Sequence, residues 1–595
     1  MKIQYILRQY TSNAIFELSG NQLSIDEIQV QETRKEFEGD YTINVFPLIK
    51  LAKMNPQETA EFIGNYLLAN VVEIEKFNII KGFLNLSLHD SFWIKQLTGF
   101  SQHMEFAWKH THSPIKIMVE YSSPNTNKPL HLGHIRNNLL GYSCAEILKA
   151  RGHNVTKANI INDRGIHICK SMLAWMRYGN GETPESTGMK GDHLVGKYYV
   201  EFNTIYEAEI AVLEREGLEK EQAKKEAPIM KEAQEMLRKW EEDDETTLEI
   251  WNMMNRWVYS GFDETYKALG VDFDLKQYES ETYILGKKIV HEGLSKGVFY
   301  KKEDGSVWID LTDEGLDEKL LLRADGTSVY MTQDLGTALE RFNDFHLDSL
   351  VYVVGNEQEY HFKVLSLVFR KLGYSWWQAL FHLSYGMVDL PSGKMKSREG
   401  TVVDADDLIA EMIETAKQKT IELGKIEGMY PDEQNELFRK IGMAALKFFI
   451  LRTDPKKRMV FNPEESIDFH GFTGPFIQYS FARIKSLLRK STEIEKHVMP
   501  ANLNTSLSSE ERELIKTLYK RDEKLEEAER EYSPAVLANY AYELAKLFNK
   551  FYHERQVLNE PDPELRHFRL ALSEETAKTL EETLKLLGIE MPERM

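Results

Sequence analysis

The chain has 595 residues, of which 42% are hydrophobic and 28% charged. This composition is ordinary for a globular protein, and the length predicts about three to five domains. With 74 Lys and Arg against 94 Asp and Glu, the formal net charge is −20. Composition alone therefore argues against a nucleic-acid-binding protein with a broadly basic surface, although a local basic track remains compatible with it.

The cysteines and the apolar runs exclude further classes. Cys144 and Cys169 are the two cysteines, and they form neither a Cys-x-x-Cys pair nor a zinc-ligand spacing. We therefore expect no structural metal and a reducing, cytoplasmic environment. The first residues show no signal-peptide pattern. No run approaches ~18 apolar residues, which predicts that no segment spans a membrane.

Four domains are expected in chain order, which makes the fold a multidomain α/β architecture. Residues 1–112 mix helical stretches with short alternating segments and predict an α+β domain. Residues 113–390 predict a Rossmann-type parallel-sheet core, interrupted at about 180–290 by a charged helical insertion that could lack any chemistry of its own. The last two domains are a basic loop with connecting helices at 391–460 and an all-α helical bundle at 461–595.

The Rossmann-type core is predicted from alternating strand and helix patterns. The apolar run 115–121 is typical of a buried strand, the residues after it have helical spacing, and 154–162 predicts a second strand. The sheet pattern resumes near 328–334. The run 349–355 is almost continuously apolar, as in a central parallel strand. This βαβ pattern predicts a nucleotide-binding sheet.

Two histidines, His131 and His134, lie with Gly133 at the turn between the first strand and its helix. There, free backbone N–H groups and the positive end of a helix attract phosphate, and a glycine lets a nucleotide approach closely. Two imidazoles can also donate hydrogen bonds to phosphate oxygens as charge develops in a transition state. The simpler alternative is a loop with two solvated histidines.

A glycine-bounded basic loop follows the sheet, in the string Gly393-Lys-Met-Lys-Ser-Arg-Glu-Gly400. Lysines and an arginine on such a loop can neutralise charge as pyrophosphate leaves a triphosphate. In isolation, the string could equally be a basic surface loop.

The string Ser122-Ser-Pro-Asn-x-x-Lys-Pro-x-His-x-Gly-His134 resembles the HIGH signature in the form that arginyl-tRNA synthetases carry, and the basic loop resembles their KMSKS signature. This resemblance to a class I aminoacyl-tRNA synthetase extends over nearly the whole chain. It implies ATP- and Mg²⁺-dependent activation of L-arginine and transfer to the terminal adenosine of tRNA(Arg). His131 and His134 would be catalytic. The residues assigned to ATP are His131, Gly133, His134, His361, Lys394, Lys396, Ser397 and Arg398.

The resemblance also implies an arginine site. A guanidinium presents a planar fork of donors that carboxylates match bidentately. The guanidinium is assigned to Glu120, Tyr330 and Asp334. The α-amino group is assigned to Asn125 and Gln358, and the carboxylate to Ser123. Asp334 could instead be the N-cap of a helix that begins at residue 335, whereas an unpaired, buried Glu120 would be costly without such a role.

Two departures from the family pattern leave roles open. Ser397 stands where the second signature lysine is usual, and Lys128 is expected to act in its place as a catalytic residue. Lys394 or Lys396 could fill that role instead, and Lys128 could be a solvated loop lysine. The segment 162–167 also differs from the family, so no role is assigned to its Arg164 or His167.

The terminal domains imply a tRNA partner. The N-terminal domain resembles one that contacts the tRNA D-loop, where Phe83 and Asn85 would bind a splayed base; a core Phe and a strand Asn are the alternative. Residues 461–595 resemble the anticodon-binding domain, and we expect a monomer. Two rivals remain, namely a synthetase for another amino acid, which should lack the pair Glu120 and Asp334, and a non-catalytic RNA-binding relative.

Overall fold

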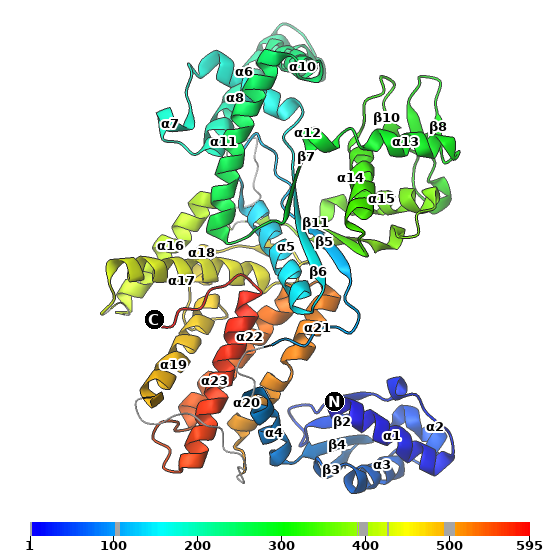
Figure 1. Cartoon of the computed structure of the whole chain (residues 1–595), viewed down its shortest axis with the longest axis vertical. Helices are drawn as coiled ribbons and strands as arrows, with labels where there is room; N and C mark the ends of the chain where they lie inside the picture. The colour runs from blue at the N-terminus through cyan, green and yellow to red at the C-terminus, as the bar shows by residue number, and fades with distance from the viewer. Residues whose placement is uncertain are drawn as a thin grey trace. The chain divides into compact units, whose positions relative to one another are not determined.

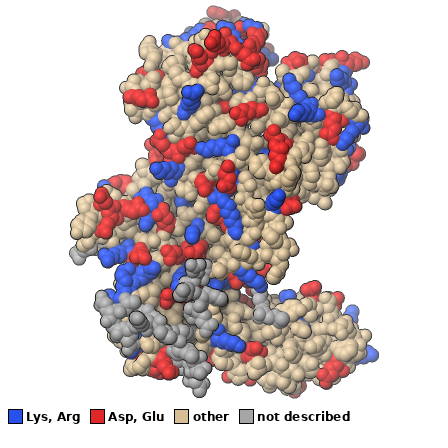
Figure 2. Space-filling model, viewed as in Figure 1, with Lys and Arg blue, Asp and Glu red and all other residues tan. Residues whose placement is uncertain are grey.

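The computed structural model describes residues 3–101, 107–389, 391, 403–424, 426, 428–492 and 506–595. These form two compact units, each assembled from segments that are distant in the sequence. The first contains Met1–Phe106, Leu487–Lys520 and Lys546–Ala577, and the second contains Ala107–Ser486, Arg521–Ala545 and Lys578–Met595. On the face shown in Figure 2, basic and acidic side chains are interspersed.

The first unit contains a four-stranded antiparallel sheet in the order β1-β2-β4-β3. Its strands are β1 Val30–Glu32, β2 Tyr41–Asn44, β3 Ile74–Ile80 and β4 Phe83–Leu88. Its N-terminal helices are α1 Ile3–Ser19, α2 Ile49–Ala52, α3 Pro56–Asn70 and α4 Asp90–Ser101. Helix α3 begins with a capping box formed by Asn55 and Glu58.

The second unit is built around a five-stranded parallel sheet in the order β12-β11-β5-β6-β7. Its strands are β5 Lys116–Glu120, β6 Asn154–Ile161, β7 Leu275–Tyr278, β11 Ser349–Gly355 and β12 Leu380–Tyr385. The three strands expected at 115–121, 154–162 and 349–355 are therefore confirmed. Strand order reverses between β5 and β11, and ligands of such sheets bind outside the carboxyl ends at this point.

The helical insertion is confirmed, although it is shorter than expected (Figure 1). Its helices are α6 Ile166–Tyr178, α7 Pro184–Thr187, α8 Gly191–Arg215, α9 Lys220–Glu226, α10 Pro228–Glu241 and α11 Glu245–Leu269. Strand β7 then pairs with β6. The sheet therefore resumes at residue 275, within the range 180–290 that the sequence assigned to helices.

A small antiparallel sheet, β10-β9-β8, lies between β7 and β11 in the sequence. Its strands are β8 Phe299–Lys301, β9 Val307–Ile309 and β10 Lys319–Leu322. The helices around it are α12 Glu279–Thr282, α13 Gly286–Ser295, α14 Tyr330–Phe345 and α15 Glu359–Leu372. Figure 1 shows this group beside β11.

The expected strand at 328–334 is wrong, and so is the alternative role of Asp334 as a helix N-cap. The segment leads into helix α14 rather than a strand, because its buried residues Met331, Leu335, Ala338 and Phe342 recur at helical spacing. That period becomes visible only over a stretch longer than the seven residues 328–334. The helix begins at Tyr330 with Val329 as N-cap, so Asp334 lies inside the first turns and is not a cap.

The described part of the chain after residue 403 is almost wholly helical, as expected. Its helices are α16 Ala405–Glu422, α17 Pro431–Leu451, α18 Pro463–Ser466, α19 Gly474–Thr492, α20 Ser509–Tyr519, α21 Arg521–Glu531, α22 Pro534–Glu554 and α23 Pro563–Lys585. A short parallel pair joins β13 Val388–Asp389 to β14 Met459–Val460. Within the described ranges, no helix is both long and apolar enough to cross a membrane.

Candidate active site

The two histidines form the N-terminal cap of α5, which spans Leu132–Ala150. The His131 Nδ1 accepts a hydrogen bond from the Gly133 N–H at 3.1 Å, and the His134 Nδ1 accepts one from the His131 N–H at 3.1 Å. The two ring centroids are 3.9 Å apart. This reciprocal arrangement is a capping box made from imidazoles, and it fixes the orientation of both rings.

The expectation of free backbone N–H groups at this turn is wrong. The Leu132 N–H donates to the Val403 carbonyl at 3.1 Å, and the His134 N–H donates to the His131 carbonyl at 2.7 Å. The Gly133 N–H is already bound to the His131 ring. Because these three backbone N–H groups already donate hydrogen bonds within the protein, the imidazole N–H groups are the donors that this turn can offer to a phosphate.

Both imidazoles are neutral near pH 7. Burial lowers the pKa of His131 to about 4, with a further contribution from the charge of Lys128. Burial also holds the pKa of His134 well below its ordinary value, and His131 and Lys128 add to the effect. Since each Nδ1 accepts a hydrogen bond, the single ring proton of each is on Nε2. The turn thus presents two Nε2–H donors.

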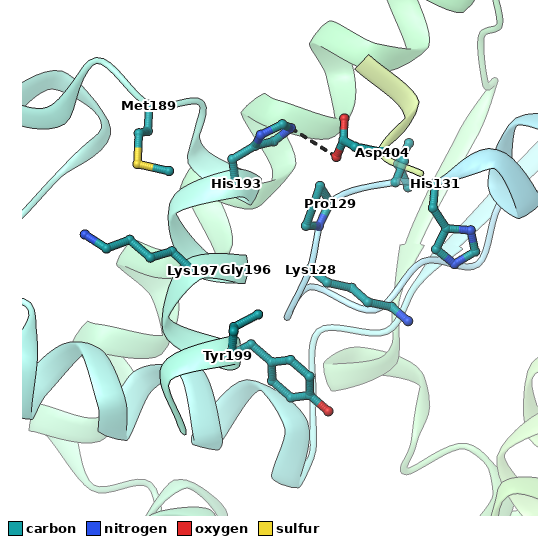
Figure 3. Close-up of a pocket in the computed structure, with 11 residues that line it drawn as sticks. Lys128, Pro129, His131, Met189, His193, Gly196, Lys197, Tyr199 and Asp404 are labelled. Atoms are coloured by element: carbon teal, nitrogen blue, oxygen red, sulfur yellow. Dashed lines mark ion pairs between the residues drawn. The ribbon is translucent and has the colours of Figure 1, made fainter. Parts of the chain in front are cut away.

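Lys128 lies three residues before His131 and lines the same pocket of about 280 Å³. In Figure 3 its side chain extends below the ring of His131. The proximity agrees with its effect on the histidine pKa values. Its catalytic role stays a prediction. The expected loop residues Lys394, Lys396, Ser397 and Arg398 lie outside the described residues.

Glu120 ends β5 and is 7% exposed. Its carboxylate accepts a hydrogen bond from the guanidinium of Arg341, a fully buried residue of α14. A buried carboxylate without a partner is costly, so Arg341 accounts for an acid at this position. Glu120 therefore binds a guanidinium of its own chain, and its contact with substrate arginine stays a prediction.

Asp334 and Tyr330 lie on the first turns of α14. The Asp334 Oδ2 is 2.5 Å from the His361 Nε2, which brings α14 and α15 together at this point. Tyr330 is exposed, with 67% of its surface accessible. The structure thus pairs His361, which was expected to bind ATP, with Asp334, which was expected to bind arginine.

Glu279 is a candidate that the sequence did not suggest. It is half-buried directly after β7, near Asp334 and Tyr330. Its pKa is raised to about 7, mainly by burial; the positive charge of Arg164 opposes this rise, and the negative charges of Asp163 and Asp334 add to it. A cationic partner would stabilise the ionised form of a carboxyl group whose pKa is raised in this way. Its position after a strand was the available signal, but β7 was assigned to the insertion.

The three remaining residues of the expected arginine site follow the carboxyl ends of β5 and β11. Ser123 is exposed, and Asn125 is half-buried and forms a backbone bridge with Asn162 after β6. Gln358 is exposed at the N-cap of α15, and its side chain makes no cap hydrogen bond. They share the sheet edge of the histidine turn, and their contacts with a ligand stay predictions.

The segment 162–167 connects this edge to the insertion. The Asp163 carboxylate accepts hydrogen bonds from the Tyr259 hydroxyl at 2.8 Å and the Ser280 N–H at 2.9 Å. The guanidinium of Arg164 lies 3.9 Å from the Tyr283 ring centroid. The departure from the family pattern at residue 164 therefore has a packing role.

In the first unit, Asn85 is 1% exposed within β4. Its Oδ1 accepts from the Thr42 hydroxyl at 2.7 Å, and its Nδ2 donates to the Asn78 Oδ1 at 2.9 Å. Phe83 packs edge-to-face against Phe46, with centroids 5.6 Å apart. These contacts match the structural alternative for Asn85, and base binding stays a prediction.

Among the described residues, one cluster, formed by Asp192, His193 and Asp406, has ligand atoms close enough together to hold a metal ion. The ammonium of Lys190, however, lies 2.5 Å from the Asp406 Oδ2 and 3.2 Å from the Asp192 Oδ2. A lysine thus already neutralises the carboxylates that a cation would need. The donor set does not fit a dedicated Mg²⁺ site.

Three family descriptions match the chain in succession. Residues 2–88 match the arginyl tRNA synthetase N terminal domain. Residues 99–462 match the catalytic domain of tRNA synthetases class I (R). Residues 477–595 match the DALR anticodon binding domain.

Whole-length similarity gives the same result. The arginine–tRNA ligase of Parabacteroides distasonis is 54% identical over 598 residues, covering 99% of this chain and 100% of the relative. That of Flavobacterium psychrophilum is 53% identical, with full coverage of both. Among solved structures, the Thermus thermophilus arginyl-tRNA synthetase superposes with a TM-score of 0.79 at 25% identity and full coverage of both chains. The chain therefore belongs to the arginyl-tRNA synthetases, a family of class I aminoacyl-tRNA synthetases.

Proposed function

We propose that the chain attaches L-arginine to tRNA(Arg) at the expense of ATP. One observation supports this most: the histidine turn and the acidic residues Glu279 and Asp334 belong to the same carboxyl edge of one parallel sheet. The turn offers neutral donors for phosphate, and the carboxylates suit a cationic side chain. A site with both properties fits ATP and arginine as joint substrates.

In the first step, a carboxylate oxygen of arginine attacks the α-phosphorus of ATP. The bond from that phosphorus to the bridging oxygen breaks, and arginyl-adenylate and pyrophosphate form. The Nε2–H groups of His131 and His134 stabilise the charge that builds on the phosphate oxygens, and Lys128 adds a positive charge beside them. Catalysis comes from positioning and charge, without a protein nucleophile.

In the second step, the 2′-hydroxyl of the terminal adenosine of tRNA attacks the adenylate carbonyl. The ester bond forms, AMP leaves, and the hydroxyl proton is released. The domain at 1–112 contacts the tRNA, with Phe83 stacking on a base, and the helices at 461–595 bind the anticodon. This division follows the family resemblance.

Mg²⁺ belongs to the proposal as the companion of the ATP phosphates, which bind it together with water. No residue of this chain is assigned to it. We further propose a monomer that works in the cytoplasm. Both cysteines are free and buried, which suits a reducing compartment.

The experiment is an aminoacylation assay with the full chain, ATP, Mg²⁺, total bacterial tRNA and labelled arginine. We expect acid-precipitable label that depends on ATP and tRNA. Labelled lysine is the matched control, because it has a similar length and charge without the planar fork. Equal charging with lysine, or no charging with either, would overturn the proposal.

A further inference from the structure

The segment 403–406 runs beside the histidine turn as a short antiparallel pairing. The Leu132 N–H donates to the Val403 carbonyl at 3.1 Å, and the Ala405 N–H donates to the Leu130 carbonyl at 3.0 Å. Leu132 is the first residue of α5, where helices leave N–H groups without internal partners. The segment 403–406 therefore supplies one of the bonds that fix the start of α5.

Side chains from the helical insertion hold this segment in place. The His193 Nε2, on α8, lies 3.4 Å from the Asp404 Oδ2 and 3.1 Å from the Asp406 Oδ2. The ammonium of Lys190 lies 2.5 Å from the Asp406 Oδ2. The Thr265 hydroxyl, on α11, donates to the Asp406 Oδ1 at 2.8 Å. Figure 3 shows the His193 ring facing Asp404.

The charges of this network favour the contact. Burial alone would raise the pKa of Asp406, but hydrogen bonds from His193 and Lys190 lower it to about 2. The hydrogen bond to Asp406 likewise raises the pKa of His193, although burial opposes this. Half-buried ion pairs with several hydrogen bonds are stronger than exposed ones. Asp404 also caps α16 by accepting from the Asp406 N–H at 2.8 Å.

We propose that His193 and Lys190 are positioning residues for adenylate formation, which hold Asp404 and Asp406 and thereby fix the histidine turn. The inference rests on the proposed function. Neither residue needs to touch a substrate. A small shift of the segment 403–406 would loosen the bond to Leu132 and tilt the Nε2–H donors, and misplacement of about 1 Å can cost a large factor in rate.

The test measures single-turnover adenylate formation in variants of the full chain. We expect His193→Ala to lower the rate constant about tenfold while leaving the KM for arginine unchanged. His193→Gln should retain most of the rate, because its amide N–H can reach the position of the imidazole Nε2. Asp263→Asn is the control: it removes the ion pair between Asp263 of α11 and Lys276 of β7, which is not part of the network around Asp404 and Asp406.

A double-mutant cycle with His131→Asn separates positioning from a general loss of stability. Asn can still cap the helix but lacks the Nε2–H, so the His193→Ala change should cost less in that background than in the wild type, where both donors are positioned. Equal losses in both backgrounds would overturn the inference. So would a His193→Ala loss that appears only in the KM for arginine.

Hydrogen exchange gives a second readout that does not depend on activity. The Leu132 amide should exchange faster in His193→Ala and Lys190→Gln than in Asp263→Asn. Unchanged protection would overturn the inference while leaving the proposed function intact. A wild-type chain without arginine-dependent adenylate formation in the presence of tRNA would overturn the proposed function itself.

Discussion

The histidine turn and the acidic residues Glu279 and Asp334 share one edge of a sheet, yet they are organised in opposite ways. At the turn, both imidazoles are neutral, and the N–H groups of Leu132 and Gly133 already have partners. On the acidic side, carboxyl groups lie near one another, and the pKa of Glu279 is raised to about 7 mainly by burial.

We infer from this difference that the histidine turn serves the chemical step, whereas the acidic residues select the amino acid. A preformed, neutral turn needs no rearrangement when ATP binds, and its donors gain most when charge develops in the transition state. A positive charge stabilises the ionised forms of carboxyl groups that lie close together. The acidic residues therefore contribute when the cationic side chain of the amino acid binds. Changes at the turn should therefore lower kcat, and changes on the acidic side should raise the KM for arginine.

The largest effect is expected at the turn. His131→Asn and His134→Ala should each lower the rate of adenylate formation by about 10²- to 10³-fold, the size of losing one transition-state donor. Asn at position 131 preserves the helix cap, so its thermal stability should stay near wild type. Near-normal pyrophosphate exchange in either variant would contradict the role of the Nε2–H donors.

The next effect concerns the acidic side. Asp334→Asn should raise the KM for arginine by about 10- to 100-fold, because a charge-assisted hydrogen bond to the guanidinium is lost. The KM for ATP should change little. His361→Gln serves as the matched control, since it perturbs the same contact from α15. Equal damage to both KM values in Asp334→Asn would show that Asp334 acts through the His361 contact alone.

Variants of Lys128 test which residue supplies the positive charge of the second signature lysine, whose usual position is occupied by Ser397. Lys128→Ala should slow adenylate formation roughly tenfold, and Ser397→Lys in that variant should restore part of the loss by returning a charge to the basic loop. The comparison uses pre-steady-state rates of the wild type, both single variants and the double variant. Wild-type rates in Lys128→Ala would refute the idea, as would a strong loss confined to Lys394→Ala or Lys396→Ala.

The smallest effect is a pH dependence. Because the pKa of Glu279 is about 7, its carboxyl is mostly neutral at pH 6 and mostly ionised at pH 8, while arginine stays charged. The kcat/KM for arginine should therefore rise by up to roughly tenfold across this range. Glu279→Gln should flatten that rise, whereas Asp334→Asn should retain it. An unchanged profile in Glu279→Gln would assign the titration elsewhere.

The sequence predicts the parallel core well because its evidence is local. The apolar runs that became β5, β6 and β11 are continuous, and the cap residues of α5 are adjacent in the chain. It fails where the deciding partner is distant. Local spacing cannot predict the ion pair between Glu120 and Arg341. It also cannot predict the hydrogen bond from the Leu132 N–H to the Val403 carbonyl.

Short elements were missed for a related reason. Strand β7 has four residues and follows a long helical insertion, so its pattern is too brief to stand out. Glu279 was missed with it, because a strand end is recognised only once the strand is. The segment that leads into helix α14 was predicted as a strand because the helical spacing of its apolar residues appears only over a longer stretch of sequence.

The most direct test of the contrast between the two regions is pyrophosphate exchange into ATP with each of the twenty amino acids, with and without tRNA. We expect exchange with arginine and none with lysine above background, because the turn serves any adenylate while the acidic residues select a planar cation. Exchange with a different amino acid would contradict the role of Glu279 and Asp334. Absence of exchange with all twenty, in the presence of tRNA, would contradict the catalytic role of the histidine turn.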